Sequence, residues 1–282
     1  MSVIKFGILG GDYRYKILRE LLKKDGYSVN CYEGSLSDTV ENIQELFGLS
    51  DVVIAPIPCS KDGKTVFLSE PYTIKQMLTD MDKNGCRVLI GGVMSDYIKQ
   101  EAARLNIRVY DFFDMEELAV LNAIPTSEGA IQTAMEESDR TLFGSNVIVL
   151  GYGRCGKILS KTLKGIGAKV SVTYRKEADR AYITAEGMTP IGFKELYCYI
   201  SGFDFIFNTI PALVLNREML KKVAKSAIII DLAQAPGGTD FVYARDLNLK
   251  ALYCPGLPGR VAPYTAAEIL KDAAISVAMN GK

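Results

Sequence analysis

At 282 residues the chain is long enough to bury the cores of two ordinary domains, and its hydrophobic content of 48% and charged content of 23% are those of a globular protein. Lys plus Arg and Asp plus Glu number 33 each, which excludes a strong overall attraction to nucleic acid or to an anionic membrane surface. The sequence contains no histidine, which excludes an imidazole base and every His-ligated metal site, and we expect no metal cofactor.

Hydropathy and cysteine usage narrow the class further. No apolar run approaches the roughly 18 residues that a membrane span requires, and the first residues read as a strand rather than a signal peptide. The six cysteines are scattered without C-x-x-C pairs, which favours free thiols over disulfides or a zinc site. We therefore expect a cytoplasmic protein with neither a membrane nor a nucleic acid as its partner.

The first part of the chain alternates β-rich runs with stretches of helical spacing. Pro71 suits the first turn of a helix, and Gly85 suits the position just after a helix end. Such alternation predicts a parallel sheet covered by helices on both faces. The predicted strands are 5–9, 27–31, 51–55, 87–91 and 107–111, and the predicted helices are 12–25, 36–47, 71–84 and 95–105.

A longer helical region at about 114–141 follows, with an interruption expected near Pro125, and the run T-S-E-G from Thr126 is typical of a helix start. The alternation then restarts, and a final amphipathic helix runs from Pro263 to Met279. The strands predicted here are 146–150, 169–173, 203–208, 226–231 and 250–253.

This order fits either one large α/β sheet or two domains. We favour an α/β fold of two Rossmann-like, doubly wound parallel-sheet domains with an interdomain cleft, because the second half begins with its own nucleotide signature. The first domain, Rossmann-like or flavodoxin-like, would span residues 1–125 and bind substrate. The second would span residues 126–282 and bind NADP, with a linking helix at 126–141. Whether helix 263–280 packs back on the first domain is left open.

The nucleotide signature is the run N-V-I-V-L-G-Y-G-R-C-G from Asn146, which places G-x-G-x-x-G between a strand and a helix. Gly151 permits the tight turn, Gly153 lets a pyrophosphate approach the backbone, and Gly156 lets the helix pack closely on the strand. The helix start, with Arg154 and Cys155, offers N–H groups to the phosphates. Cys155 itself is interpreted as a small packing residue rather than a nucleophile.

The next strand ends in V-S-V-T-Y-R-K, where an NAD site would carry a carboxylate for the ribose hydroxyls. Arg175 reverses that preference, because a guanidinium pairs with a 2′-phosphate. Lys176 adds charge, and Tyr174 or Thr173 supplies a hydroxyl donor. The sequence therefore predicts NADP, unless Arg175 and Lys176 are plain solvated charges.

Ligands of open α/β sheets collect at the carboxyl ends of the strands. In the second domain these ends carry the remaining predicted cofactor contacts, namely Asn208, Thr209, Pro211, Asp231, Leu232 and Ala233. In the first domain, Asp12 and Arg14 either cap a helix and pair with one another or bind substrate. Lys61 and Asp62 read as part of a D-G turn, and Arg260 reads as a ligand contact in a Gly/Pro-rich loop.

Nearly the whole chain resembles the A subunit of dipicolinate synthase from spore-forming bacteria. The motifs that carry the resemblance are G-G-D-x-R at Gly10, P-I-P-x-S-K-D-G at Pro56, I-P-T-S-E-G-A-I at Ile124, D-L-A-x-x-P-G-G at Asp231 and P-G-L-P-G-x-V-A-P at Pro255. The second domain also resembles the cofactor domains of D-2-hydroxyacid and alanine dehydrogenases, but those enzymes rely on a catalytic histidine that this chain lacks.

The resemblance implies an oxidoreductase of a lysine-pathway branch. Its reaction would be oxidation of dihydrodipicolinate, or of its hydroxylated tetrahydro precursor, to pyridine-2,6-dicarboxylate by hydride transfer to NADP during sporulation, in the cytosol of the mother cell. The partner that it implies is a flavoprotein-like B subunit, and we expect a homo-oligomer. A dianionic substrate calls for Arg and hydroxyl donors. Ser60, Thr126 and Ser127 would bind it, and the catalytic candidates are Asp12, Arg14, Glu128 and Arg260, with Asp12 and Glu128 as proton acceptors.

Two other functions remain open. One is a different NADP-dependent dehydrogenase, with a layout similar to shikimate dehydrogenase, in which Lys61 and Asp62 would act. The other is a non-catalytic, nucleotide-binding protein whose partner performs the chemistry.

Overall fold

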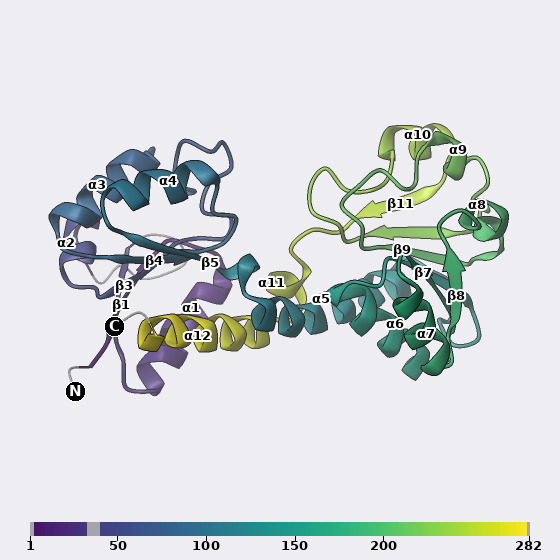
Figure 1. The fold of residues 1–282 in the computed structure, drawn as a ribbon, viewed down its shortest axis with the longest axis horizontal. Coiled ribbons are helices and arrows are strands. Elements are labelled where there is room, and N and C mark those ends of the chain that lie inside the picture. The colour runs from purple at the N-terminus through teal and green to yellow at the C-terminus, as the bar shows by residue number, and fades with distance from the viewer. Residues whose placement is uncertain (1–2, 33–39, 281–282) are drawn as a thin grey trace. The chain divides into compact units, whose positions relative to one another are not determined.

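The computed structural model describes residues 3–32 and 40–280, which divide into two compact units (Figure 1). Unit 1 comprises Met1–Leu121 with Ala262–Lys282, and unit 2 comprises Asn122–Val261. The last helix, grouped with the second domain in the sequence-based division, thus belongs to unit 1. The start of the helix predicted at 36–47 lies outside the described residues.

Unit 1 is built on a five-stranded parallel sheet with the order β2-β1-β3-β4-β5. This is a doubly wound order, in which the ligand crevice forms where the strand order reverses, between β1 and β3. The strands are β1 (Lys5–Leu9), β2 (Ser28–Tyr32), β3 (Val52–Ile54), β4 (Val88–Gly91) and β5 (Arg108–Asp111), followed by the short 3₁₀ turn η1 (Phe112–Asp114).

Helices cover both faces of this sheet (Figure 1). The helix α3 starts later than predicted, because Thr73 caps it with a reciprocal capping box to Gln76, and Pro71 lies before that cap. Gly85 follows the helix with a φ of +78°, as predicted. One face carries α1 (Tyr13–Lys24) and α12 (Pro263–Asn280), and the other carries α2 (Ile43–Gly48), α3 (Ile74–Lys83) and α4 (Asp96–Arg104).

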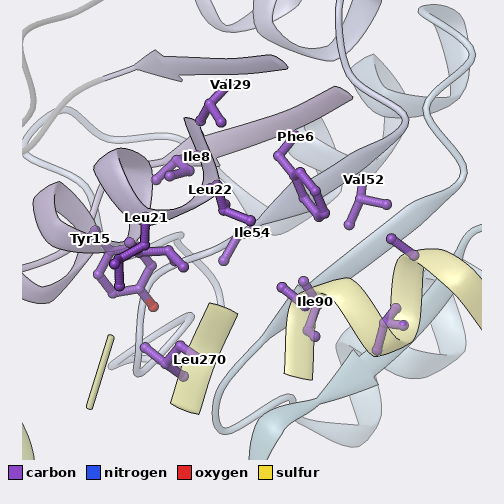
Figure 2. Close-up of a cluster of buried hydrophobic side chains, with 14 of the residues drawn as sticks. Phe6, Ile8, Tyr15, Leu21, Leu22, Val29, Val52, Ile54, Ile90 and Leu270 are labelled. Atoms are coloured by element: carbon purple, nitrogen blue, oxygen red, sulfur yellow. The ribbon is translucent and has the colours of Figure 1, made fainter. Parts of the chain in front are cut away.

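The core between the sheet and the helix pair α1 and α12 is shown in Figure 2. Phe6 and Ile54 point from the strands toward Leu22 of α1 and Leu270 of α12, and all four are buried. Full burial of a side chain of this size contributes roughly 1.5–3 kcal/mol. Apolar contact therefore explains why the end of the chain returns to unit 1.

Unit 2 holds a six-stranded parallel sheet with the order β11-β10-β9-β6-β7-β8, the strand order of dinucleotide-binding folds. The strand β8 was not predicted, because Pro190 and Gly192 are poor strand formers; as an edge strand it tolerates the proline. The strands are β6 (Asn146–Leu150), β7 (Lys169–Tyr174), β8 (Thr189–Gly192), β9 (Phe205–Asn208), β10 (Ile228–Asp231) and β11 (Lys250–Tyr253).

Two helical layers cover the second sheet (Figure 1). The first contains α6 (Arg154–Ile166), α7 (Glu177–Ala185), α11 (Leu257–Val261) and the part of α5 (Glu116–Glu136) that follows Leu121. The other contains α8 (Leu196–Tyr199), η2 (Ile200–Gly202), α9 (Arg217–Leu220) and α10 (Phe241–Asp246). Doubly wound parallel sheets in both units confirm the predicted fold class.

The helix α5 corrects two predictions, because it runs without a break through Pro125 and through Thr126, where a helix start was expected. A proline inside a helix removes one backbone donor. The hydroxyls that follow it bond to the nearby carbonyls: Thr126 Oγ1 donates to Asn122 O at 2.7 Å and Ser127 Oγ to Ala123 O at 2.7 Å. Both bonds lie within α5 itself, and the helix continues through the proline.

The segment from Pro255 to Tyr264 corrects a third prediction. It was expected to be a Gly/Pro-rich loop, but it forms α11 and the first turn of α12, which starts at Pro263. Arg260 therefore lies on a short helix.

Candidate functional site

The glycine turn after β6 has the geometry of a dinucleotide-binding loop. Gly151 has a φ of +98°, and a Cβ there would lie 2.8 Å from Thr209 Oγ1. A Cβ on Gly156 would lie 2.1 Å from the carbonyl oxygen of Gly151, so only glycine lets α6 begin this close to β6. Around Gly153, no described atom lies within 4 Å of the Cβ position. These are the three places where such a loop needs a tight turn, close packing and an open approach to the backbone.

The first turn of α6 follows directly. Its N-cap is Gly153, and no described side chain caps it, so the amide groups of this turn face solvent or an anion. Arg154 is exposed in this turn. Cys155 is half-buried, and burial raises the pKa of its thiol to about 11 despite a hydrogen bond with Ser127 that lowers it. The thiol is thus protonated at neutral pH, which agrees with a packing role.

The end of β7 presents positive charge where NAD sites present a carboxylate. Thr173 is fully buried, and its Oγ1 accepts a 2.7 Å bond from Gly151 N, so it ties the strand to the glycine turn rather than facing a ligand. Tyr174 is half-buried, while Arg175 and Lys176 are exposed. Within residues 3–32 and 40–280 neither cation forms a salt bridge, so their charge is not neutralised by a neighbouring carboxylate.

A buried polar hub holds the loops after β9 and β10. The Asp231 carboxylate is fully buried. It accepts bonds from Asn208 Nδ2 at 3.0 Å, Ala233 N at 3.0 Å, Gly238 N at 2.9 Å and Thr239 Oγ1 at 2.6 Å. Asp231 and Asn208 therefore use their side chains to fix the loops.

The other residues predicted around that hub differ in accessibility. Thr209 Oγ1 donates to Leu150 O at 2.8 Å, which ties its loop to the end of β6. Ala233 is buried, Leu232 is partly exposed and Pro211 is exposed.

Tyr152, between the two glycines of the turn, is a residue that the sequence reading missed. Its ring is buried, and its hydroxyl donates to Glu186 Oε2 at 3.1 Å. Burial and this bond raise the pKa of the phenol to about 12. The other carboxylate oxygen of Glu186 lies 2.9 Å from Lys161 Nζ. Tyr152 thus anchors the turn to the segment just after α7; an aromatic residue within a glycine motif is the only signal of it in the sequence.

In unit 1, the turn after β1 fixes an arginine. Asp12 caps α1 by accepting from Arg14 N at 3.0 Å, and its carboxylate also holds the guanidinium, with Nε at 2.9 Å and Nη2 at 2.6 Å. The Arg14 side chain is only 12% exposed. Burial opposes the guanidinium charge, but the bond and charge of Asp12 outweigh it, so the pKa of Arg14 is raised. The predicted cap and ion pair are both present, and a contact of this pair with substrate stays a prediction.

The loop after β3 is held by Asp62, as a D-G turn requires. Asp62 Oδ1 accepts from Lys64 N at 2.8 Å, Thr65 N at 2.7 Å and Ser60 Oγ at 3.0 Å, and Thr65 Oγ1 donates to Oδ2 at 2.7 Å. These bonds hold the pKa of the Asp62 carboxyl well below its usual range. Ser60 Oγ also accepts from Gly63 N at 2.9 Å, so the hydroxyl belongs to the turn itself.

A second missed residue is Asp111, at the end of β5. Its buried carboxylate accepts from Val93 N at 3.2 Å, Met94 N at 2.6 Å and Phe113 N at 2.8 Å. Val93 has a φ of +59°, a left-handed conformation that is strained for a β-branched residue. Asp111 thus stabilises a strained, exposed loop at the carboxyl edge of the sheet.

The remaining predicted residues lie in unit 2, on α5 and α11. Thr126 and Ser127 bond to their own helix, Ser127 is buried, and Glu128 is exposed. A Cβ on Gly129 would lie 3.0 Å from Val261 Cγ2 and 3.1 Å from Leu257 Cβ, so glycine lets α11 approach α5 closely. Arg260, exposed on α11, therefore belongs to the helix that packs beside Gly129.

Among the described residues, no helix is both long and apolar enough to cross a membrane. No group of three or more Cys, Asp or Glu side chains within the same residues is arranged to hold a metal ion.

The comparison of unit 2 with known families defines its class. A family model described as "D-isomer specific 2-hydroxyacid dehydrogenase, NAD binding domain" matches residues 121–237. Together with the glycine turn and the strand order, this match identifies an oxidoreductase-type domain for a nicotinamide dinucleotide, and it confirms the predicted likeness to 2-hydroxyacid dehydrogenase cofactor domains.

A second family model, which describes the N-terminal domain of the dipicolinate synthase A subunit, matches residues 5–113. The A subunit of dipicolinate synthase from Bacillus subtilis is 36% identical over 284 residues, covering 96% of this chain and 95% of that protein. The chain belongs to the family of dipicolinate synthase A subunits, as its motifs predicted.

Two crystal structures of this family are similar over nearly the whole chain. The Bacillus subtilis structure gives a TM-score of 0.87 at 32% identity, covering 100% of this chain and 99% of that one. The structure from Bacillus halodurans gives a TM-score of 0.85 at 31% identity, covering 98% and 97%.

Proposed function

We propose that the protein oxidises dihydrodipicolinate, or its hydroxylated tetrahydro precursor, to pyridine-2,6-dicarboxylate by hydride transfer to NADP. The observation that supports this most strongly is 36% identity to a dipicolinate synthase A subunit across 96% of the chain. The glycine turn with an arginine at the end of β7 supports the cofactor half of the proposal.

NADP is favoured by the charge at the end of β7. A 2′-phosphate carries about two negative charges and forms charge-assisted hydrogen bonds with guanidinium groups. Arg175 and Lys176 are exposed and without a salt bridge among the described residues, and Arg154 is exposed at the start of α6. A carboxylate at position 175 would repel the phosphate and favour NAD instead.

The substrate half of the proposal rests on Arg14. Its guanidinium is held in place by Asp12 and is largely buried, which orients it for a carboxylate of the substrate. Because both Asp12 oxygens accept from Arg14, protonation of Asp12 would break that pair. We therefore assign Asp12 to positioning and keep Glu128, which is exposed, as the proton acceptor.

The missing histidine is compatible with this chemistry. NADP accepts the hydride, and one proton leaves the ring as the aromatic product forms; from the hydroxylated precursor one water leaves as well. A lactate-type oxidation must remove a proton from an alcohol, which calls for a tuned base near neutral pH. Here a carboxylate or water suffices as acceptor, and the chain's contribution is to hold the dicarboxylate through Arg14.

The alternative of a shikimate-dehydrogenase-like enzyme with a Lys61–Asp62 pair loses support from the geometry. Asp62 accepts four hydrogen bonds within its own turn and is held ionised, so it is poorly suited to exchange protons. A non-catalytic role of the protein remains an outcome of the test below, as does the dependence on a flavoprotein-like B subunit.

The proposal is tested by mixing the protein with NADP and freshly generated dihydrodipicolinate, with and without the B subunit, and measuring the absorbance of pyridine-2,6-dicarboxylate. NADPH must form with this substrate and not with shikimate. Arg14→Gln should reduce turnover about a hundredfold while leaving NADPH binding intact, because it removes one substrate carboxylate contact. Arg245→Gln, an exposed arginine on α10, is the matched control. No product in either mixture would refute the proposal.

A further inference from the structure

The loop after β3 folds back into a strap, here defined as residues 59–73. Phe67 N donates to Cys59 O at 2.8 Å, Val66 N donates to Tyr72 O at 2.8 Å, and Thr65 pairs with Thr73 in an antiparallel bridge. Cys59 N in turn donates to Gly92 O at 2.8 Å, which fixes the strap to the end of β4. The strap is thus an ordered part of the carboxyl edge of the first sheet.

The strap lies against the turn that carries Arg14. A Cβ on Gly10, whose φ is +69°, would lie 2.7 Å from Leu68 Cδ2 and 4.0 Å from the carbonyl oxygen of Phe67. The Tyr15 hydroxyl donates to Ala55 O at 3.0 Å, which fixes the first turn of α1 to the end of β3. Strap and turn therefore meet where the strand order reverses between β1 and β3, the place where doubly wound sheets bind ligands.

Lys61 is the cation that this strap presents. Its Nζ lies 3.7 Å from the centroid of the Phe67 ring, which is 43% exposed. Its neighbour Asp62 is occupied by four neutral donors, and within the described residues Lys61 forms no salt bridge. A cation that contacts only an exposed aromatic face is weakly held, so it can form an ion pair with a carboxylate instead.

Arg14 and Lys61 suit the two charges of one ligand. Arg14 is anchored by Asp12 on one side of the reversal point, and Lys61 is carried by the strap on the other. A single anchored arginine would satisfy any monocarboxylate. Selection of a dianion requires a second cation that becomes paired only when the second carboxylate is present.

Resting on the function proposed above, we propose that Lys61 is a specificity-determining residue that binds one carboxylate of the cyclic dicarboxylate while Arg14 binds the other. Ser60 and Asp62 then act through the turn, by holding Lys61 in place. Lys61 touches the substrate carboxylate and not the carbon that loses hydride.

The test measures calorimetric binding of pyridine-2,6-dicarboxylate and of pyridine-2-carboxylate to the full chain with NADP present. Lys61→Met, which keeps the aliphatic stem, should weaken binding of the dicarboxylate about tenfold or more and change that of the monocarboxylate less than about threefold. Lys61→Arg should restore most of the discrimination. Lys64→Met, on an exposed lysine of the same strap, should change neither.

Turnover of dihydrodipicolinate by the wild-type protein, measured in parallel, separates a failure of the Lys61 assignment from a failure of the proposed function. The assignment of Lys61 is wrong, and the proposed function stands, if the wild type converts the substrate but Lys61→Met still binds the dicarboxylate with an affinity within about twofold of the wild type. The same holds if Lys61→Met loses no more affinity for the dicarboxylate than Lys64→Met does. If the wild type neither turns over nor binds the dicarboxylate, both are refuted.

Discussion

Replacing Asp231 by alanine tests whether the buried hub organises the cofactor loops. The carboxylate is fully buried, and its two oxygens accept four hydrogen bonds, one from Asn208 at the end of β9 and three from the loop after β10. Truncation would remove the acceptor of all four donors at a fully buried position.

The size of the effect follows from those bonds. An unsatisfied buried donor costs about 1–3 kcal/mol, and some of the four donors will find new partners as the loops relax. We therefore expect Asp231→Ala to lower the free energy of unfolding of unit 2 by about 3–5 kcal/mol, in line with other buried charges that lose their partners. Asp231→Asn should cost roughly half as much, because it keeps one acceptor oxygen but turns an amide toward two donors.

The assay is urea unfolding with hydrogen exchange of the peptides that span residues 228–240. The amides of Ala233 and Gly238 should lose protection first, because both donate to Asp231. Asp246→Ala, on an exposed aspartate of α10, is the control and should change stability by less than about 0.5 kcal/mol. A loss below about 1 kcal/mol in Asp231→Ala would refute the argument that the hub is desolvated and structural.

Three further predictions concern the cofactor loop. Gly156→Ala should abolish NADPH binding in a fluorescence titration, because the added Cβ would overlap the Gly151 carbonyl. Gly165→Ala is the control in the same helix: its added Cβ has open space, so it should keep NADPH binding and raise the free energy of unfolding by up to about 1 kcal/mol. Arg175→Asp should move the ratio of NADPH to NADH affinity toward NADH by about thirtyfold or more, roughly 2 kcal/mol for one exposed pair lost and one repulsion gained; an unchanged ratio would mean that the phosphate is recognised elsewhere. Alkylation at pH 8 followed by mass spectrometry should modify exposed Cys198 but spare Cys155, since a thiol pKa raised to about 11 leaves almost no thiolate at that pH; equal labelling would contradict the burial of Cys155.

The sheets of both units could be predicted from the sequence because parallel strands read as short apolar runs. The run N-V-I-V-L from Asn146 becomes β6, and the glycine turn after it has the positive φ and the close contacts that its spacing predicts. The strand β8 was not predicted because its T-P-I-G run has a low strand propensity and is stabilised by pairing with β7.

Helix ends were harder to predict than strands. Pro125 and the run from Thr126 look like a helix boundary, yet α5 continues through both, and the Thr126 and Ser127 hydroxyls bond to carbonyls of the same helix. The Gly/Pro-rich run at Pro255 becomes α11, because Gly129 on α5 leaves room for it to pack. Neither helix boundary can be predicted from the sequence without knowing which segments pack together.

The candidate site also contains some residues that the sequence could predict and others whose roles depend on the folded structure. Residue types at strand ends led to Arg14 and Arg175, whose charge is the signal. The roles of Asn208, Asp231 and Asp111 depend on which backbone donors lie nearby, and that is decided by loop conformation. The side chains of Asn208 and Asp231 hold the polypeptide around the ends of β9 and β10, and their contact with the cofactor stays a prediction.

The central claim is that this chain itself transfers a hydride from the dicarboxylate substrate to NADP. It is tested most directly by measuring NADPH formation at 340 nm and pyridine-2,6-dicarboxylate formation in the same reaction, with NADP or NAD as the only added oxidant. The account predicts about one NADPH for each product molecule, with NADP preferred over NAD. Product formed without NADPH, or formed equally well with no dinucleotide present, would contradict it.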